Sequence, residues 1–564
     1  MRGRIVIIVM ALAAVAIAFA ASGDGDGGDG DGDDGARPDA AERSAKPAAD
    51  TVRLAFAYSP EKEGLLAPLV ERFNAQRRSS GGGTVVVDAS VVPSGEAETR
   101  IARGTLRPAL WSPASSFWGR LLNHEADRRL VPDDNPSIVR TPLVIAMWEQ
   151  LAEAYGYPQR RLGYKELSEL ATRGWAAAGK PQFGPFKYVH TNPDFSTSGL
   201  SAVAASYYAA AGKREGLTEA DVVNARTKVR RLERSIVHYG DTTLFISDEL
   251  RRNGLGYASA VAMEEITLLD FNRRAGDGER LVAIYPEEGT FVSDNPLITL
   301  DADWVTPEQK EAAKLFAAFL AEQVTPAAAG REGFRPADET KPPAGLVSRE
   351  FGADPEQPAR VLRVPEPKVL VKIKSAWRSD RKPANVLVVF DNSDSMGEES
   401  KIVEAKKGLE AFFREAAPQD RIGLMRFSTD IEQLVPIAPV RTNRSKLLQA
   451  TGTILPNGDT RLRDAAVFAV DAVEARLQRD AINAVVLLTD GEDTVSSRSA
   501  DQVVEELEAQ SRKESGQIRV FTIAYGSDPN ESELARYAEA TGGNSYEGTK
   551  DDIEAIYLKI SSFF

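Results

Sequence analysis

Oxygen-bearing side chains follow apolar segments at three places in the last third of this 564-residue chain. Asp391, Ser393 and Ser395 come directly after VLVVF, Thr460 lies in a Gly-Asp-Thr-Arg-Leu segment, and Asp490 follows AVVLL and a threonine. Carboxylate and hydroxyl oxygens are hard ligands of the kind that Mg²⁺ prefers. The residue types therefore predict a divalent-cation site, provided that the fold brings the three places together.

The elements around these residues predict the required meeting point. Between residues 384 and 564 short apolar strands alternate with helical patterns, with strands expected at VLVVF, RIGLMRF, AVVLLT and IRVFTIAY. Such alternation is typical of an α/β fold whose mostly parallel central sheet is buried on both faces. Ligand-binding loops in these sheets lie at the carboxyl ends of the strands, where all three polar segments are expected.

These residues resemble the von Willebrand factor type A (VWA) family, which has a Rossmann-like fold and a metal-ion-dependent adhesion site. The resemblance implies that Ser393, Ser395 and Thr460 contact Mg²⁺ directly, with Mn²⁺ and Ca²⁺ as alternatives, and that Asp391 and Asp490 act mostly through water. It also implies a protein partner whose Asp or Glu carboxylate completes the coordination. The competing interpretation is that Asp391 caps the next helix and that the other residues only form turns.

A second folded region is expected over residues 52–345. Strand-like runs such as VRLAFAY and TVVVDASVV alternate with helical runs, and TPLVIAMW at 141–148 and a strand-like return near 254–271 suggest two crossings. This order predicts two α/β lobes. The first lobe would span about 52–145 and 270–345, and the second about 146–269.

This region resembles the two-lobed extracytoplasmic solute-binding proteins of the molybdate, sulfate and phosphate receptor kind. The matching segments are AYSPEKEGLLAPLVERFN, WSPASSFW, TPLVIAMW, TNPDFSTSG and IYPEEGTFVSDNP. The resemblance implies a periplasmic-binding-protein-like module that holds a ligand in the cleft between the lobes. Candidate cleft residues are Tyr58, Ser59, Trp111, Ser112, His190, Ser196, Thr197, Ser198 and Glu264.

The hydroxyl groups of Ser196, Thr197 and Ser198 directly precede an apolar helical run. Hydroxyls and free N–H groups at a helix N-terminus favour an anion, so we expect a small anion or another polar solute. The alternative is that these hydroxyls are only helix caps.

The amino terminus predicts export. Residues 1–21 combine two early positive charges, a 17-residue uncharged run and small residues at its end, which is typical of a signal peptide, with an N-terminal membrane anchor as the alternative. Residues 22–50, rich in Gly and Asp, are expected to form a disordered linker. The protein would then be extracytoplasmic, either secreted or held at the outer face of the cytoplasmic membrane by its N-terminal segment.

Composition excludes several functions. The net charge of −14 argues against a nucleic-acid partner, and the absence of cysteine excludes disulfides, thiolate metal sites and an N-terminal lipidated cysteine. The Gly174–Lys180 segment has P-loop spacing, but Pro181 stands where Ser or Thr should follow. Neither a metalloprotease motif nor a nucleophile elbow occurs in the sequence, so we expect a binding protein rather than an enzyme.

Residues 346–383 are expected to form a Pro-rich connector, with one short strand near 368–374. The whole sequence then predicts an exported surface protein whose VWA domain binds a protein partner through Mg²⁺ and is coupled to a solute-binding module. The alternative is a transport receptor that delivers a small anion or polar solute to a permease, with the VWA domain as a docking module.

Overall fold

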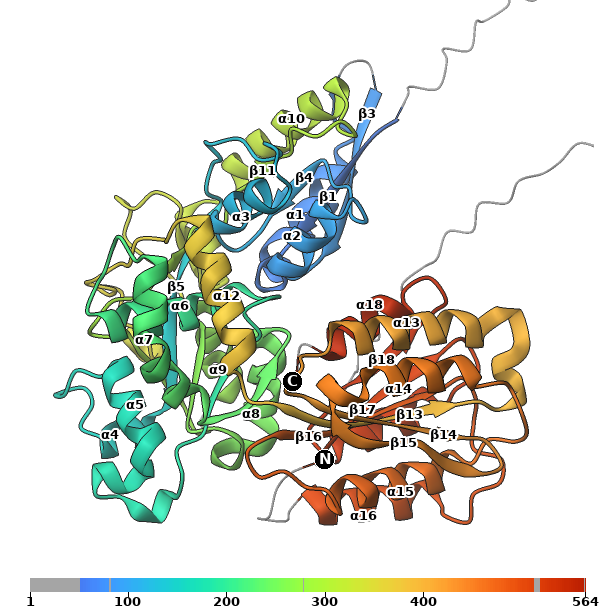
Figure 1. Cartoon of the computed structure of the whole chain (residues 1–564). Helices are drawn as coiled ribbons and strands as arrows, with labels where there is room; N and C mark the ends of the chain where they lie inside the picture. Colours follow the sequence, from blue (N-terminus) through green and yellow to red (C-terminus); the bar gives the residue numbers. More distant parts are fainter. Residues whose placement is uncertain (1–50, 81–82, 277, 512–517, 562) are drawn as a thin grey trace, which may run out of the picture. The chain divides into compact units, whose positions relative to one another are not determined.

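The computed structural model describes residues 51–80, 83–276, 278–511, 518–561 and 563–564. The predicted leader and Gly/Asp-rich linker lie outside these residues. Within them the chain forms three β-sheets with helices packed against them, which confirms the expected α/β class (Figure 1).

The first sheet has the strand order β11-β4-β1-β3-β2. Its main strand, β1, runs parallel to β3 and β4, while β11 and β2 are antiparallel to their neighbours. The strands are β1 (Thr51–Tyr58), β2 (Ser79–Ser80), β3 (Gly83–Val91), β4 (Leu110–Ser112) and β11 (Ile298–Thr299). The accompanying helices are α1 (Glu63–Ala75), α2 (Ser94–Ala102), α3 (Phe117–Glu125), α10 (Pro307–Gln323) and α11 (Pro326–Arg331).

The second sheet has the order β10-β5-β8-β6-β7, and β9 and β12 also pair with β5. Strand β9 falls in the range expected for the first lobe but hydrogen-bonds to β5 in this second sheet. The strands are β5 (Val139–Trp148), β6 (Tyr188–Thr191), β7 (Ile236–Gly240), β8 (Ala260–Glu264), β9 (Leu281–Ile284), β10 (Val292–Ser293) and β12 (Arg335–Pro336). The helices are α4 (Glu149–Ala154), α5 (Tyr164–Arg173), α6 (Thr197–Ala211), α7 (Glu219–Glu233), α8 (Thr243–Tyr257) and α9 (Glu265–Ala275).

The third sheet has the order β15-β14-β13-β16-β17-β18 and is parallel except for β15. Helices cover both of its faces (Figure 1). The strands are β13 (Ala384–Asp391), β14 (Arg421–Phe427), β15 (Ile431–Pro439), β16 (Ile482–Thr489), β17 (Ile518–Tyr525) and β18 (Ser545–Gly548). The helices are α13 (Lys401–Glu415), α14 (Val440–Thr453), α15 (Leu462–Glu474), α16 (Ala500–Ser511), α17 (Glu531–Glu539) and α18 (Ile553–Ser561).

Every residue of β13, β16 and β17 is buried, because strands covered by helices on both sides face apolar surroundings in both directions. The four expected strands are confirmed. Strand β15 and helix α14 were not expected. Most residues of β15 are partly exposed at the edge of the sheet, so the strand gives a weaker apolar signal.

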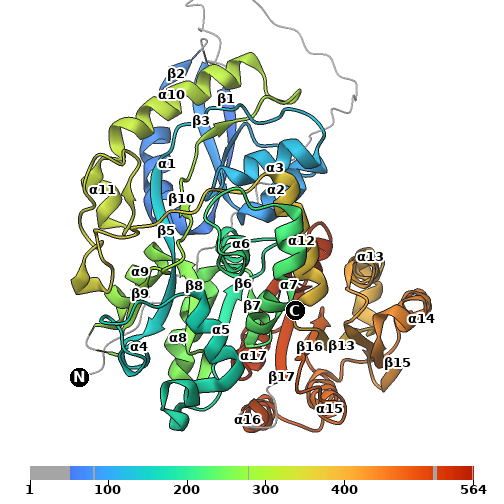
Figure 2. The ribbon, with the colours of Figure 1, turned by 60° about the vertical axis from the view of Figure 1, so that its left-hand side comes forward.

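The connector contains a helix instead of the short strand expected near 368–374, so that expectation was wrong. Helix α12 (Pro367–Asp380) buries Val369, Leu370, Ile373 and Trp377. These positions follow helical spacing, and Pro367 stands in the first turn, where its missing N–H costs nothing. Helix α12 contacts α3, α6 and α7, and Figure 2 shows it beside α7.

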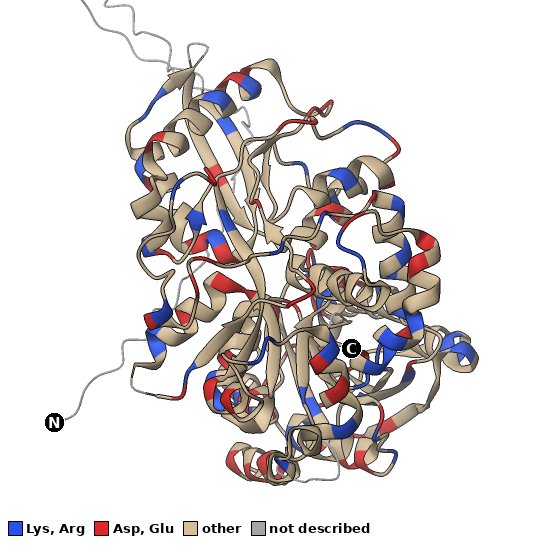
Figure 3. Cartoon of the chain, turned by 90° about the vertical axis from the view of Figure 1, so that its left-hand side faces the viewer, with Lys and Arg blue, Asp and Glu red and all other residues tan. Residues whose placement is uncertain are grey.

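Acidic and basic residues are interspersed over the described elements (Figure 3). No helix among the described residues is long and apolar enough to cross a membrane. The predicted N-terminal anchor lies outside the described residues.

Candidate functional site

The five predicted metal-site residues follow elements of the third sheet. Asp391 is the last residue of β13, and Ser393 and Ser395 lie in the turn after it. Asp490 follows β16, which pairs in parallel with β13, so both strands deliver their next residues to the same edge. Thr460 lies two residues before α15.

Hydrogen bonds hold four of these residues together. Ser393 Oγ lies 3.0 Å from Ser395 Oγ, which donates to Asp490 Oδ1 at 2.8 Å. The Asp391 carboxylate accepts from Thr489 Oγ1 at 2.6 Å and from the Ser393 backbone N–H at 2.7 Å. Each carboxylate is thereby fixed in orientation before any ion binds.

The Thr460 hydroxyl lies near the Ser395 hydroxyl, beside Gly491. A Cβ atom added at Gly491 would lie 3.6 Å from Thr460 Oγ1 and 3.8 Å from Ser395 Oγ. The glycine therefore borders a small space shared by these two hydroxyls. Ser395 also belongs to the hydrogen-bonded group of Asp391, Ser393 and Asp490. A donor set of three hydroxyls and two carboxylates fits a hard divalent cation such as Mg²⁺.

The electrostatics of the site leave it moderately negative. Burial raises the pKa of Asp391 to about 6, while hydrogen bonds from Thr489 and Ser393 oppose that rise. Asp490 is fully buried and has a cation beside it, because Lys401 Nζ lies 2.8 Å from Asp490 Oδ2. The sequence motif did not indicate Lys401, although Thr489 could have been noticed as the neighbour of Asp490.

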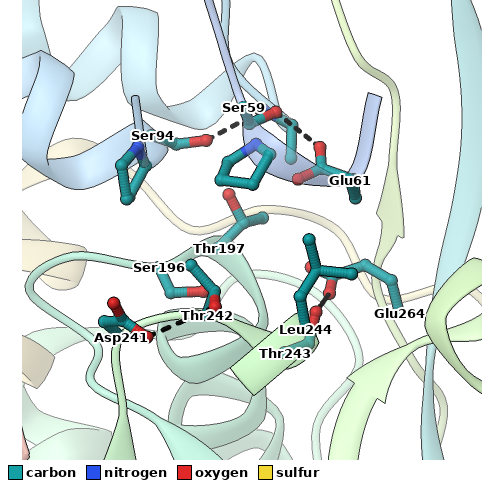
Figure 4. Close-up of a pocket in the computed structure, with 13 residues that line it drawn as sticks. Ser59, Glu61, Ser94, Ser196, Thr197, Asp241, Thr242, Thr243, Leu244 and Glu264 are labelled. Atoms are coloured by element: carbon teal, nitrogen blue, oxygen red, sulfur yellow. Dashed lines mark hydrogen bonds between the residues drawn. The ribbon is translucent and has the colours of Figure 1, made fainter. Parts of the chain in front are cut away.

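A second candidate site is a pocket lined by residues from both of the first two sheets and their helices (Figure 4). Its cavity volume is about 20 Å³, enough for a group the size of one water molecule. The lining residues are Ser59, Pro60, Glu61, Pro93, Ser94, Ala114, Ser196, Thr197, Asp241, Thr242, Thr243, Leu244 and Glu264.

Four of the nine residues predicted for the cleft line this pocket: Ser59, Ser196, Thr197 and Glu264. The other five, Tyr58, Trp111, Ser112, His190 and Ser198, do not line it.

Some of these five side chains lie in the apolar core, and others contact residues outside the pocket. Tyr58 and Trp111 belong to the apolar core, and the buried Ser112 hydroxyl has no hydrogen-bond partner. His190 contacts Glu233 through Nε2 at 3.1 Å, and Ser198 Oγ lies 2.8 Å from Thr191 Oγ1.

The structure does not support the interpretation that the Ser196 hydroxyl caps helix α6. Ser196 occupies the N-cap position of α6 but makes no side-chain cap bond. Its Oγ lies 3.1 Å from Ser198 Oγ, and Thr197 Oγ1 accepts a hydrogen bond from Trp118 Nε1 at 2.8 Å.

The sequence analysis missed Glu61, Ser94, Asp241, Thr242 and Thr243 as lining residues. Asp241, Thr242 and Thr243 directly follow β7, so the end of a strand before a helix was the available signal. Glu61 and Ser94 carry no local signal, because their position opposite β7 and β8 depends on the packing of the two sheets.

Comparison with known proteins agrees with this architecture. The family model of bacterial extracellular solute-binding proteins matches residues 54–335, which is half of the chain, and that of the von Willebrand factor type A domain matches residues 385–557. An uncharacterized protein of Mycobacterium tuberculosis is 23% identical over 498 residues, which cover 85% of this chain and 70% of that protein.

Other relatives match only part of the chain. Human inter-alpha-trypsin inhibitor heavy chain H4 is 28% identical over 186 residues, covering 31% of this chain and 19% of that protein. The chain thus matches about a fifth of the length of that relative.

Solved structures match part of the chain. A periplasmic thiamin binding protein covers 58% of this chain and 96% of its own at 13% identity and a TM-score of 0.41. The conserved hypothetical protein BatB from Bacteroides thetaiotaomicron covers 32% of this chain and 97% of its own at 20% identity and a TM-score of 0.27. Because the solute-binding model matches half of the chain, the chain belongs to the bacterial extracellular solute-binding proteins, and it carries a von Willebrand factor type A domain C-terminal to that module.

Proposed function

We propose that this is an extracytoplasmic, non-enzymatic binding protein whose VWA domain binds a protein partner through a divalent cation. The observation that carries the proposal is the convergence of Asp391, Ser393, Ser395, Thr460 and Asp490 at one edge of the third sheet. A bound divalent cation would supply an electrophilic centre that accepts a carboxylate oxygen from outside the chain.

The chain's own residues prepare the site for that role. Ser393, Ser395 and Thr460 would offer neutral hydroxyl oxygens, so little of the ion's charge would be cancelled by the protein. Thr489 and the Ser393 N–H orient Asp391, and Ser395 orients Asp490, whose other carboxylate oxygen pairs with Lys401. Such supporting hydrogen bonds are typical of residues that hold ligands in position.

Calorimetric titration of the full chain with MgCl₂ and MnCl₂ tests the metal site. We expect one cation per chain, and we expect the Ser393→Ala/Ser395→Ala variant to lose this binding. Ser375→Ala/Ser379→Ala, which changes two exposed serines of α12, is the matched control and should bind as the parent does. Equal binding by both variants would contradict the site.

Partner binding needs a separate measurement. Envelope proteins retained by the immobilised full chain should be released by EDTA and should not bind the Ser393→Ala/Ser395→Ala variant. Retention of every partner regardless of EDTA and of the variant would contradict metal-dependent binding.

We also propose that the cleft pocket binds a small polar solute. Support comes from its lining, in which hydroxyl and carboxylate side chains of both sheets face one space (Figure 4). Thermal unfolding with candidate solutes tests this proposal, because a ligand that binds only the folded state raises the melting temperature.

A further inference from the structure

The pocket between the first two sheets has an unbalanced charge. Its three ionisable lining residues, Glu61, Asp241 and Glu264, are all carboxylic acids. None of the lining residues is basic. The charge of the ligand therefore depends on how far nearby cations already compensate these carboxylates.

The negative charge of Glu61 is compensated by a neighbouring lysine. One oxygen of its carboxylate accepts a hydrogen bond from Ser59 Oγ at 2.5 Å and lies 3.3 Å from Lys62 Nζ. The lysine is fully buried, and it also donates to Ser59 Oγ at 2.5 Å and to Asn295 Oδ1 at 2.9 Å. Lys62 is thus held beneath the pocket and is not available to a ligand.

Asp241 is compensated as well. Its Oδ2 lies 3.4 Å from Lys559 Nζ, and its Oδ1 accepts from Thr242 Oγ1 at 3.3 Å.

Glu264 has no such partner among the described residues. It is only 4% exposed at the end of β8, and its carboxylate accepts a hydrogen bond from its own backbone N–H and a long one from Thr243 Oγ1 at 3.4 Å. No ion pair holds it, and Lys62 acts on it only from a distance. Figure 4 shows Glu264 beside Thr243, across the pocket from Ser59 and Ser94.

A buried carboxylate without a cation is costly, because its charge loses hydration without replacement. Burial accordingly raises the pKa of Glu264 to about 8, and the nearby Glu61 adds to the rise while Thr243 and Lys62 oppose it. Burial without a cation therefore favours the neutral, protonated form of Glu264. A positive group beside it would let it ionise and would supply the missing partner.

We infer that the cleft takes a small ligand with a protonated primary or secondary amine, and that the ammonium group faces Glu264. The inference rests on the proposed solute-binding function and names the class of solute. It replaces the anion expected from the hydroxyls of Ser196 and Thr197, because no lining residue is basic and an anion would find no cation in the pocket to pair with.

The lining also distinguishes between kinds of amine. Sites for quaternary ammonium groups are typically cages of aromatic rings. No aromatic residue lines this pocket, whereas hydroxyls of Ser94, Ser196 and Thr197 do. An N–H-bearing ammonium can donate to these oxygens and to Glu264, and a hydroxyl on the same ligand would suit the remaining lining. The cavity volume of about 20 Å³ fits the ammonium group alone, so we expect the rest of the ligand to extend out of the pocket.

The test compares ligands of one shape and different charge. Ethanolamine, ethylene glycol and glycolate are titrated into the full chain at neutral pH, followed by 3-amino-1-propanol, 1,3-propanediol and 3-hydroxypropionate. We expect the amines to raise the melting temperature and to bind in calorimetry, and the hydroxy acids to do neither. Titration in buffers of different ionisation enthalpy should show close to one proton released per amine, as Glu264 ionises.

Glu264→Gln keeps the shape of the side chain and removes its charge. We expect the variant to fold, to bind the amines about 10-fold or more weakly, and to release no proton. Glu98→Gln is the matched control, since Glu98 is an equally buried acid that does not line the pocket, and it should bind amines as the parent does.

Three outcomes would overturn the inference: binding of a hydroxy acid in preference to its amine, amine binding that Glu264→Gln leaves unchanged, or no amine binding at all. The first outcome would leave the proposed solute binding intact and overturn only the ligand class. The metal titration of the VWA domain is independent of all three.

Discussion

Lys401 Nζ lies 2.8 Å from one carboxylate oxygen of Asp490, and Ser395 Oγ donates to the other oxygen at the same distance. The protein therefore places its own cation beside a residue proposed to support a metal ion. Lys401 is largely buried at the start of α13, so this pair is not a solvent-screened surface contact.

Replacing Lys401 by methionine should strengthen cation binding. The change removes a positive charge near the site and frees Asp490, and a gain of about 1.4 kcal/mol would raise the affinity about 10-fold. Calorimetric titration with MnCl₂ measures the change. Lys407→Met, which alters an exposed lysine of the same helix, should leave the affinity as it is. Weaker binding by Lys401→Met would show instead that the lysine is needed to orient Asp490.

Gly491→Ala should weaken cation binding without affecting folding. The new methyl group would make ordinary contacts of 3.6 Å with Thr460 Oγ1 and 3.8 Å with Ser395 Oγ, so the free energy of unfolding should change by about 0.5 kcal/mol or less. The methyl group would nevertheless occupy the space beside the two hydroxyls. Titration with MgCl₂ and urea unfolding together check both expectations. An alanine at Gly452, where the added atom meets nothing, serves as the control. Unchanged affinity in Gly491→Ala would argue that the ion does not use this space.

Glu98 should make stability depend on pH. It is fully buried, its Oε1 has no hydrogen-bond partner in the described part of the chain, and burial raises its pKa from an ordinary value near 4.5 to about 7. Glu125 and Asp194 add to this rise, whereas Lys374 and a hydrogen bond from Thr99 oppose it. The folded chain thus binds more protons than the unfolded chain between these pKa values, so stability falls as the pH rises through that range.

Glu98→Gln should remove this fall. At pH 8 the variant should be more stable than the parent by about 2–3 kcal/mol, and below pH 4.5 the Glu98 contribution to the difference should vanish. Urea unfolding of both proteins at several pH values provides the measurement. A difference that does not vary with pH would contradict the assigned cause.

Trp377 should be a main source of stability for α12. Its side chain is buried, its ring meets the Tyr239 ring edge-on at 5.2 Å, and its Nε1–H donates to Glu233 Oε2 at 3.2 Å. Trp377→Ala should lower the free energy of unfolding by about 3–5 kcal/mol, because the buried ring is lost and a cavity is left behind. Ser375→Ala, at an exposed position of the same helix, should cost far less. Equal effects of the two changes in urea unfolding would show that α12 is not anchored by its apolar face.

The metal site was largely predictable because its parts are local. Asp391, Ser393 and Ser395 lie within five residues, and an apolar strand places them at its carboxyl end. Two parallel neighbours then bring Asp490 to the same edge, which is a general property of such sheets. Lys401 could not be predicted, because a lysine at the start of a helix is usually solvated.

The pocket, in contrast, was not predictable as a site, because its parts are not local in the sequence. Glu61 follows β1, Asp241 follows β7 and Glu264 ends β8, and no spacing in the sequence relates these three positions. The serines and threonines near α6 predicted a polar site. The expectation of an anion, however, rested on one helix N-terminus considered alone.

The sequence by itself determined the two α/β modules, their order and the donor types of the metal site, because strand period, helix spacing and a short motif are local properties. Only the tertiary structure decided which carboxylates already have a cation beside them. Compensation of a charge depends on atoms within about 4 Å in space. Lys62 is the sequence neighbour of Glu61, but Lys401 and Lys559 lie far along the chain from Asp490 and Asp241, the carboxylates that they compensate.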